Sequence, residues 1–404
     1  MTQKLKFPEN FLWGAATAAH QIEGNNTNSD WWAWENSIKR HNQLIALGKN
    51  PADFCSDIAC DSYNRFDEDF SLAQHLGHNA HRLSVEWARI EPKEGKFDEK
   101  ELDHYEKVLQ SAKFHGLTTF ITLHHFTNPL WFIKKGGFEK KQNINHFVKF
   151  CLIAAKRLNE YADFWIIFNE PEVYSSTSYL SGRWPPQKKN IFSAIKVSNN
   201  IITAHNTIVS KIRLEIRKPV GLAYNLVDWQ PADKIFGGFA AFLHRKINKY
   251  IFSRTIQSCD FIGVNYYFHH HVGLFGHRGH SQRGHERSDI GWGIHPEGLE
   301  QVLLDLRRIG KPIYITENGL ADAHDEKREK FIKDHLNYIH RAISKGADVR
   351  GYLYWSLLDN FEWEKGFAPR FGLIEIDRED LLRRRVRYSA IKYAEICKNN
   401  YMEY

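Results

Sequence analysis

The sequence predicts an α/β fold, a single (β/α)8 barrel over residues 1–404 with active-site loops at the C-terminal ends of its strands. Three observations predict it: eight short apolar runs recur, amphipathic helical stretches separate them, and no linker or composition shift interrupts the chain. Near-continuous apolar runs are typical of parallel strands buried on both faces. Eight alternating units favour a closed barrel over an open doubly wound sheet.

The predicted strands are rich in Val, Ile, Leu and aromatic residues. From the second strand onward, their ends lie 38 to 55 residues apart. This spacing is sufficient for a right-handed strand–helix–strand crossover. The strands are expected at residues 11–16, 81–87, 118–125, 164–170, 220–225, 261–267, 313–318 and 351–357.

The helices between the strands begin and end at recognisable residues. Asp98 followed by Glu101 resembles a capping box. Apolar residues at helical spacing follow over 102–112, and Gly116 ends that helix. A second apolar stripe over 331–343 ends at Gly346 in the same way.

The composition is that of a globular protein. Hydrophobic residues make up 42% of the chain and charged residues 25%, with a formal net charge of +7. The chain contains no run of eighteen apolar residues and its first residues lack the apolar core of a signal peptide, so we expect a cytoplasmic protein that does not enter a membrane. Five cysteines without framework spacing predict reduced thiols.

Two other classes of partner are disfavoured by the sequence. The basic clusters, such as 383–385, are short and scattered, whereas a nucleic-acid surface needs a coherent stripe. No GxGxxG or GxxxxGK[ST] motif follows a predicted strand, which disfavours nucleotide binding. We therefore expect neither a nucleic acid partner nor a cofactor.

The ends of the predicted strands carry polar and aromatic residues, and catalytic residues of such barrels lie at these ends. Two glutamates, Glu170 and Glu317, come from the fourth and seventh strands. Burying both without a function would desolvate two carboxylates. Around them the strand ends supply Arg82, Trp87, His124, His125, Asn169, Asn225, Asn265, Tyr266, Tyr267, Trp355, Glu362 and Trp363.

A pair of carboxyl groups suits hydrolysis of a glycosidic bond. One carboxyl donates a proton to the leaving oxygen, and the other attacks the anomeric carbon or activates water against it. Tryptophan faces offer flat apolar surfaces for a sugar ring, and polar side chains bind its hydroxyls.

Four motifs lie in order along the chain. They are Phe-Leu-Trp-Gly-Ala-Ala-Thr-Ala-Ala-His-Gln-Ile-Glu-Gly at 11–24, Asn-Glu-Pro at 169–171, Ile-Thr-Glu-Asn-Gly at 315–319 and Trp-Ser-Leu-Leu-Asp-Asn-Phe-Glu-Trp at 355–363. With these motifs the chain resembles glycoside hydrolase family 1, the β-glucosidase and β-galactosidase family, along nearly its whole length. Each motif alone is weak, but together and in this order they are specific.

The resemblance implies roles for the catalytic residues. Glu170 would be the general acid/base and Glu317 the nucleophile, with carboxyl groups roughly 5 Å apart for a retaining mechanism. Asn169 would contact the sugar 2-hydroxyl. Arg82 and Tyr267 would hold Glu317, with Asn265 supporting the same region.

The resemblance also implies a substrate-binding set. Gln21, His125, Glu362 and Trp363 would bind the outer hydroxyls of the glycone, and Trp355 would lie under its ring. Trp292 would be the platform for the leaving group. Such a set accepts more than one orientation of the 4-hydroxyl, so glucosides, galactosides and fucosides all stay open as substrates.

Some segments depart from the family pattern. Phe126 stands where many members have Trp, so the ring edge near the sugar's outer hydroxyls is expected to lack an indole N–H. The segment between Asn225 and Phe261 is short, so either the rim near the leaving group is more open or a helix there is shortened. Six histidines between 269 and 285 lack paired metal-ligand spacing and predict a solvated loop. Glu362 is expected to repel a sugar 6-phosphate.

The sequence therefore predicts a retaining, exo-acting β-glycosidase of β-glucosides and short β-linked oligosaccharides. Three alternatives remain: a 6-phospho-β-glycosidase, a catalytically silent sugar-binding barrel, and a metal-dependent barrel hydrolase built on the histidine cluster. Both glutamates argue against the silent barrel, and the strand ends lack a convincing ligand set for the metal enzyme.

Overall fold

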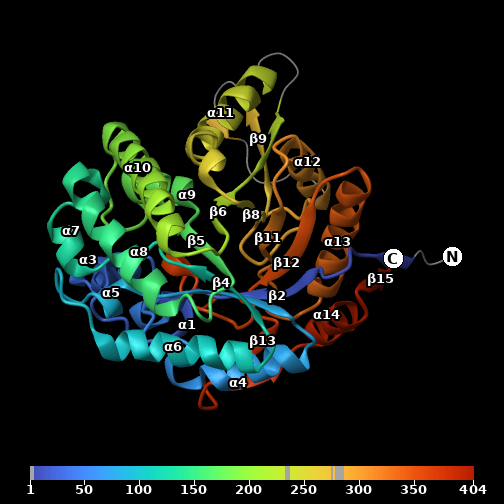
Figure 1. Ribbon diagram of the computed structural model, residues 1–404, viewed down its shortest axis with the longest axis horizontal. Coiled ribbons are helices and arrows are strands. Elements are labelled where there is room, and N and C mark those ends of the chain that lie inside the picture. Colours follow the sequence, from blue (N-terminus) through green and yellow to red (C-terminus); the bar gives the residue numbers. More distant parts are fainter. Residues whose placement is uncertain (1–3, 233–236, 274–275, 278–285) are drawn as a thin grey trace.

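A computed structural model describes residues 4–232, 237–273, 276–277 and 286–404. Eight strands, each parallel to its neighbours, close into a barrel in the order β2-β3-β4-β5-β6-β8-β11-β12, which confirms the predicted fold class (Figure 1). The strand bounds are Leu12–Ala16 (β2), Ala80–Ser84 (β3), Thr118–Thr122 (β4), Phe164–Asn169 (β5), Val220–Asn225 (β6), Phe261–Asn265 (β8), Ile313–Asn318 (β11) and Val349–Trp355 (β12).

Helices surround the barrel in the view of Figure 1. Their bounds are Ala19–Ile22 (α1), Asp30–Glu35 (α2), Ile38–Ala46 (α3), Ser62–His75 (α4), Trp87–Ile90 (α5), Glu99–Phe114 (α6), Leu130–Lys134 (α7), Ile144–Leu158 (α8), Pro171–Ser175 (α9), Ile191–Glu215 (α10), Gly237–Thr255 (α11), Pro296–Arg307 (α12), Arg328–Ser344 (α13) and Tyr388–Asn399 (α14).

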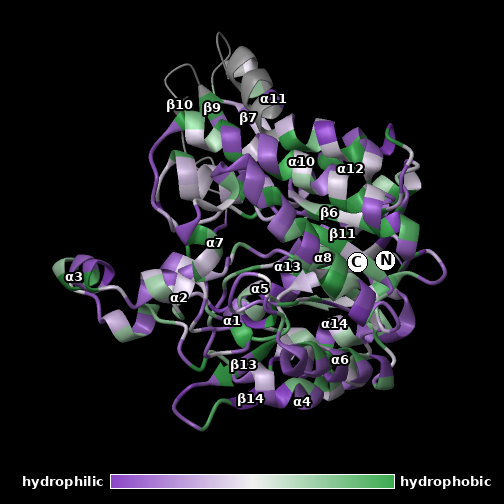
Figure 2. Cartoon of the chain, turned by 60° about the vertical axis from the view of Figure 1, so that its left-hand side comes forward, coloured by the Kyte–Doolittle hydropathy of each residue, from purple (hydrophilic) through white to green (hydrophobic). Residues whose placement is uncertain are grey.

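Helix α6 shows how the sequence sets a local boundary. Asp98 caps it by accepting a hydrogen bond from the backbone N–H of Lys100 at 2.9 Å. The second half of the predicted capping box is wrong, because the Glu101 carboxylate accepts from the Tyr63 hydroxyl instead. The predicted stripe over 102–112 is buried, and Figure 2 shows both hydrophobic and hydrophilic residues along this helix.

Aromatic rings fill the barrel interior at the N-terminal ends of the strands. Phe120, Phe164, Phe261 and Tyr314 come from four different strands and form one buried cluster. The Phe120 and Phe164 rings stack with centroids 4.2 Å apart. Since Phe164 and Phe261 are the first residues of their strands, this layer closes the N-terminal end and leaves the C-terminal end for a site.

Shorter sheets lie outside the barrel. Strands β1 (Lys4–Lys6) and β15 (Tyr401–Glu403) pair near the two ends of the chain, and β13 (Ile374–Asp377) pairs with β14 (Arg383–Val386). A third sheet contains β7 (Asp228–Pro231), β9 (His269–Gly273) and β10 (Gly276–His277).

The sheet β7-β9-β10 corrects the prediction of a solvated histidine loop. His269 and His271 belong to β9 and are buried, because β9 pairs with β7 and its side chains pack against the residues before α12. His277 lies in β10, while His280 and His285 fall outside the described residues.

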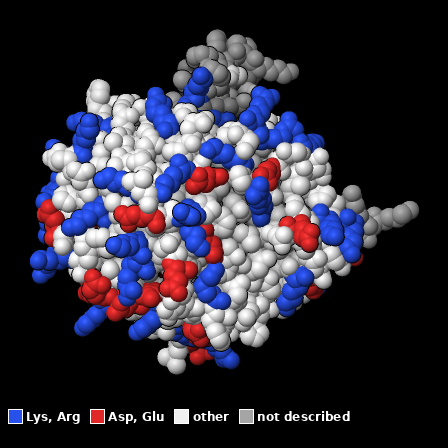
Figure 3. All heavy atoms as spheres, in the orientation of Figure 1, with Lys and Arg blue, Asp and Glu red and all other residues white. Residues whose placement is uncertain are grey.

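The structure also bears on the expected thiols, membrane segments and surface charge. All five cysteines are free thiols. Within the described parts of the chain, no helix combines the length and apolar character needed to cross a membrane. On the face drawn in Figure 3, Lys and Arg side chains are interspersed with Asp and Glu.

Candidate active site

A cavity of about 510 Å³ opens at the C-terminal ends of the barrel strands. Its lining brings together ten of the predicted site residues, from six of the eight barrel strands or the loops that follow them. These residues are Gln21, His125, Asn169, Glu170, Tyr267, Trp292, Glu317, Trp355, Glu362 and Trp363. Two further predicted residues, Arg82 and Asn265, are buried and hydrogen-bonded to members of this lining.

Glu170 follows the last residue of β5 and is 7% exposed. Its backbone is left-handed, with φ of 41°, and its N–H donates to the carbonyl of Ala223 at 2.8 Å. One carboxyl oxygen, Oε1, accepts hydrogen bonds from Asn225 Nδ2 at 3.0 Å and Asn265 Nδ2 at 2.9 Å. Burial, together with the nearby charge of Glu317, raises the pKa of Glu170 to about 7.

Glu317 lies on β11 and has a charged partner that Glu170 lacks. Arg82 donates to its Oε1 at 2.5 Å, and the Tyr267 hydroxyl donates to its Oε2 at 2.6 Å. Burial raises the pKa of Glu317, while Arg82 and Tyr267 oppose that rise by stabilising the carboxylate. The two glutamates therefore share a cavity but have different partners.

Arg82 and two asparagines connect the carboxyl groups. The Arg82 guanidinium also donates to Asn169 Oδ1 at 2.7 Å, and Asn265 Nδ2 donates to the same oxygen at 3.0 Å. Asn265 Oδ1 accepts from the Thr316 hydroxyl at 2.7 Å. Because every member is buried and hydrogen-bonded, the network holds both glutamates in fixed positions.

Gln21 and His125 bring polar groups to the cavity lining, and each has a buried atom without a hydrogen-bond partner in the described residues. Gln21 Nε2 donates to Asn360 Oδ1 at 3.0 Å and lies 3.4 Å from Glu362 Oε2. Gln21 Oε1 and His125 Nδ1 are buried and have no hydrogen-bond partner among the described residues. Burial holds the pKa of His125 well below its usual range, so its ring is neutral.

Aromatic rings surround these polar atoms. The His125 ring stacks against Trp355 and Trp363, with centroids 5.9 and 6.0 Å away. Phe126, the residue that departs from the family pattern, packs edge-on against Trp363 at 5.2 Å. A ring-shaped polar ligand would therefore find hydroxyl partners beside flat apolar faces.

The protonation of Glu362 bears on the expected repulsion of a sugar 6-phosphate. Burial, with the Glu364 charge beside it, raises the pKa of Glu362 to about 8. Near neutral pH this carboxyl is mostly protonated. The expected repulsion of a sugar 6-phosphate by Glu362 therefore acts fully only above about pH 8.

The outer side of the cavity is aromatic, with cations at its rim. Trp292 packs against Phe268 with ring centroids 4.9 Å apart and against Tyr267 at 5.5 Å. Lys365 lies over the Trp292 ring at 5.9 Å, and Arg183 is a further cation of the cavity lining. The role of Trp292 as a platform for the leaving group stays a prediction.

Chemically, the arrangement provides a buried acid and a buried carboxylate in one cavity. A group with a pKa near 7 can donate and recover a proton at neutral pH. The Glu317 carboxylate is oriented by an arginine and a phenol, as a nucleophile needs to be. These are the two carboxyl functions of glycoside cleavage.

The family model described as glycosyl hydrolase family 1 matches residues 3–256 and 248–402. The chain belongs to this family. It is similar to β-glucosidase A of Thermotoga maritima, with 30% identity and 98% and 99% of the two chains covered. It is also similar to a β-galactosidase of Pyrococcus woesei, with 27% identity and 98% and 97% covered.

Solved structures of family 1 enzymes share the fold of this family member. A β-glycosidase from Pyrococcus horikoshii superposes with a TM-score of 0.90 at 38% identity, covering 99% of this chain and 96% of the other. The T. maritima β-glucosidase in complex with glucoimidazole gives a TM-score of 0.90 at 29% identity, covering 98% and 99%. The chain is therefore a glycoside hydrolase with the (β/α)8 barrel of its family.

Three residues behave differently from what the strand ends predicted. Trp87 starts α5 and points away from the cavity, where its ring packs against Phe132 at 4.6 Å. His124 is buried outside the cavity lining, where its Nε2 contacts Asn128 Oδ1 at 3.2 Å and its Nδ1 has no hydrogen-bond partner among the described residues. Asn225 had no predicted role, yet it contacts the Glu170 carboxyl directly.

A second carboxyl beside Glu170 was also missed. Glu172 Oε1 accepts a hydrogen bond from the backbone N–H of Asn225, and its Oε2 is buried with no hydrogen-bond partner in the described residues. In the sequence, only its position two residues after Glu170, at the start of α9, indicated that Glu172 would lie near the site.

The metal hypothesis has little structural basis. Among the residues that the structure describes, no three His, Cys, Asp or Glu side chains form a group able to hold a metal ion. His269 and His271 approach each other, with Nε2 atoms 3.0 Å apart, which is also hydrogen-bonding distance.

Proposed function

We propose that this family 1 enzyme is a retaining, exo-acting β-glycosidase, and that residues 1–404 form one catalytic domain. Its substrates would be β-glucosides and short β-linked oligosaccharides. The observation that carries the proposal is the difference between the two glutamates. Glu170 has amide partners and a pKa of about 7, whereas Glu317 has the Arg82 guanidinium on its carboxylate.

In the first step Glu317 attacks the anomeric carbon while Glu170 gives its proton to the leaving oxygen. The C1–O bond breaks as the bond between C1 and the Glu317 carboxylate forms. Asn169, held by Arg82, is oriented toward the sugar 2-hydroxyl, where a contact that strengthens in the transition state assists the reaction.

In the second step Glu170 acts as the base. Once Glu317 has formed an ester it carries no charge, so the repulsion that raises the pKa of Glu170 disappears. Glu170 then ionises and takes a proton from the attacking water. Neither step requires a cofactor or a metal ion.

The shape of the cavity supports exo action and sugar selection. Gln21 and Glu362 lie within 3.4 Å of each other in its lining, beside Trp363, and the substrate's terminal unit would lie against them with its leaving group directed toward Trp292. Relatives named as a β-glucosidase and a β-galactosidase, and a related structure holding glucoimidazole, support neutral hexosides as substrates.

The 6-phospho-β-glycosidase is the alternative substrate class. Because Glu362 is mostly protonated below about pH 8, charge repulsion alone does not exclude a phosphate there. The distinction is measurable by comparing kcat/KM for a nitrophenyl glucoside and its 6-phosphate. A preference for the phosphorylated sugar would replace the proposed substrate class.

The decisive experiment traps the covalent intermediate. A 2-deoxy-2-fluoro glucoside with a good leaving group should react once and stall, because fluorine slows both steps and the activated leaving group rescues only the first. Mass spectrometry of the digested protein should place one sugar on the peptide containing Glu317. A label on Glu170 would exchange the two roles, and normal turnover without a label would contradict the retaining mechanism.

Two controls test the remaining alternatives. Activity on a nitrophenyl β-glucoside should survive excess chelator, whereas a metal-dependent hydrolase would lose it. Glu317→Gly should abolish hydrolysis, with added formate restoring turnover. A silent sugar-binding barrel would show no turnover in the unmodified protein.

A further inference from the structure

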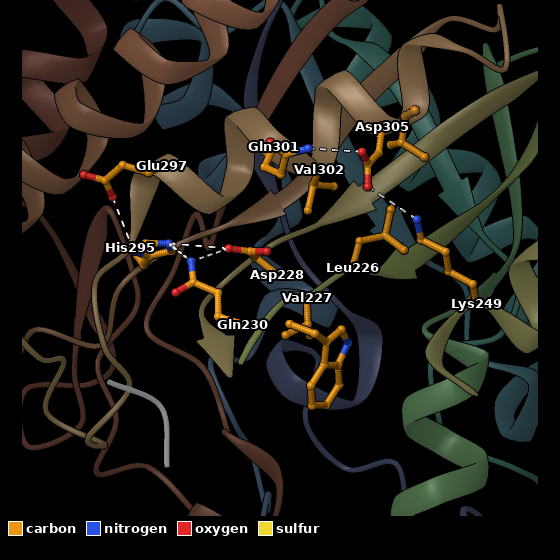
Figure 4. Close-up of a pocket in the computed structure, with 12 residues that line it drawn as sticks. Leu226, Val227, Asp228, Gln230, Lys249, His295, Glu297, Gln301, Val302 and Asp305 are labelled. Carbon is orange, nitrogen blue, oxygen red and sulfur yellow. Dashed lines mark hydrogen bonds and ion pairs between the residues drawn. The ribbon is translucent and has the colours of Figure 1, made fainter. Parts of the chain in front are cut away.

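A second cavity, of about 450 Å³, is drawn in Figure 4, and it shares Val227 and Trp229 with the lining of the catalytic cavity. It is lined by β7, by the residues before β7, and by side chains from α11 and α12. Its volume falls in the range of about 300–1,000 Å³ that is usual for small-molecule sites. None of its polar side chains belongs to the proposed catalytic machinery.

Strand β7 forms the partition between the two cavities. Val227 and Trp229 line both cavities, whereas Asp228 and Gln230 line only the second. This pattern follows from the alternation of side chains along a strand. On the catalytic side the Trp229 ring contacts His270 at 4.8 Å, and both rings belong to the cavity wall.

Two polar groups face each other across an aliphatic floor in Figure 4. On one side Gln230 donates to Asp228 Oδ2 at 2.7 Å, and His295 lies 3.6 Å from the same carboxylate. On the other side the Asp305 carboxylate, the Gln301 amide and the Lys249 amine meet. The lining also contains the aliphatic side chains of Leu226, Val302 and Leu306.

The second polar group lies on exposed helix surfaces. Gln301 Nε2 donates to Asp305 Oδ1 at 3.1 Å, and Lys249 Nζ lies 3.6 Å from Asp305 Oδ2. Asp305 and Asp228 therefore each have a cation or an amide beside them. Glu297 also lines the cavity, so three carboxylates share it with one lysine, and this excess of negative charge disfavours a phosphate.

We propose that this second cavity binds a neutral sugar unit. The hydroxyls of a sugar ring both donate and accept hydrogen bonds, and the amide, carboxylate, imidazole and amine groups of the lining need both kinds of partner. The aliphatic side chains suit the C–H face of a pyranose. The sugar is either the distal unit of a longer leaving group or a free monosaccharide. The inference goes beyond the proposed function, because binding there involves neither Glu170 nor Glu317.

The binding test uses protein whose catalytic cavity is filled by the 2-fluoroglucosyl label. Calorimetric titration with glucose should show one site, which glucose 6-phosphate does not occupy. Gln301→Ala should weaken this site about tenfold, the loss expected for one or two hydrogen bonds. Gln110→Ala is the matched control, because Gln110 is also an exposed helical glutamine with one side-chain hydrogen bond, at 3.0 Å to Tyr161.

The source of the sugar is distinguished by chain length. If the cavity takes the distal unit of a substrate, Gln301→Ala lowers kcat/KM for cellotetraose and leaves the nitrophenyl glucoside unchanged. If it takes a free sugar, only the titration changes. Labelled protein that binds no glucose, combined with no chain-length effect, would overturn the proposal. Failure of the label to attach would instead contradict the proposed function.

Discussion

Glu170→Gln tests the proposed proton transfer most directly, because the replacement preserves the surroundings of the side chain. In the native site, Oε1 of Glu170 accepts from Asn225 and Asn265 at 3.0 and 2.9 Å. A glutamine carbonyl accepts the same two hydrogen bonds, so the side chain keeps its position and loses only its proton. The variant therefore isolates acid catalysis from positioning.

The expected loss depends on the leaving group. General acid catalysis contributes roughly 10²–10⁴-fold, equal to about 2.7–5.4 kcal/mol of barrier. For cellobiose, whose leaving alkoxide is a strong base, kcat/KM of Glu170→Gln should fall by that factor. For dinitrophenyl glucoside, which departs without protonation, kcat/KM should stay within about tenfold of the unmodified enzyme.

The measurement is kcat/KM for both substrates, since this parameter reports the first step alone. Azide should raise kcat on the dinitrophenyl substrate by replacing the water that Glu170 activates, and the product should be the β-glucosyl azide. Glu172→Gln is the control, because Glu172 contacts Asn225 and should affect both substrates alike. Equal large losses on both substrates in Glu170→Gln would refute its assignment as the acid.

Three further predictions concern titration. In the free enzyme, kcat/KM should decline as pH rises through about 7, because Glu170 then loses its proton. Asn225→Ala should move that decline to higher pH, because it removes a hydrogen bond that favours the Glu170 carboxylate. An unchanged pH profile in Asn225→Ala would contradict this role. Tyr267→Phe should raise the pKa of Glu317 and so move the acidic limb of the profile upward, with a loss in kcat/KM of at least about tenfold; a loss without a shifted limb would indicate a purely structural role. The pKa of Glu362 is raised to about 8, so the folded state binds the proton of this carboxyl more tightly than the unfolded state does. The carboxyl therefore contributes stability at low pH, and this contribution is lost as pH rises through about 8. In urea unfolding, the free energy of unfolding of Glu362→Gln should therefore exceed that of the unmodified protein by more at pH 9 than at pH 5. An equal difference in this free energy at both pH values would count against the raised pKa.

The sequence alone predicted the elements whose burial pattern is local. Each predicted strand overlaps an observed barrel strand, and β6 and β11 match residue for residue. Strands buried on both faces show as continuous apolar runs, and polar residues directly after such runs mark the site. The order of the strands in a barrel then brings Glu170 and Glu317 into one cavity without further information.

Other features depended on contacts between residues distant in the chain. Strands β7 and β9 are short and polar, and they form only because each pairs with the other, so the histidine run gave no strand signal. The role of Asn225 depends on an amide reaching a carboxyl 55 residues away. The pKa of Glu362 depends on burial between loops from opposite ends of the chain. Residue identity and spacing determined the chemistry that this chain can carry, whereas burial and pairing, which arise only in the folded barrel, decided the protonation of its carboxyls and created the second cavity.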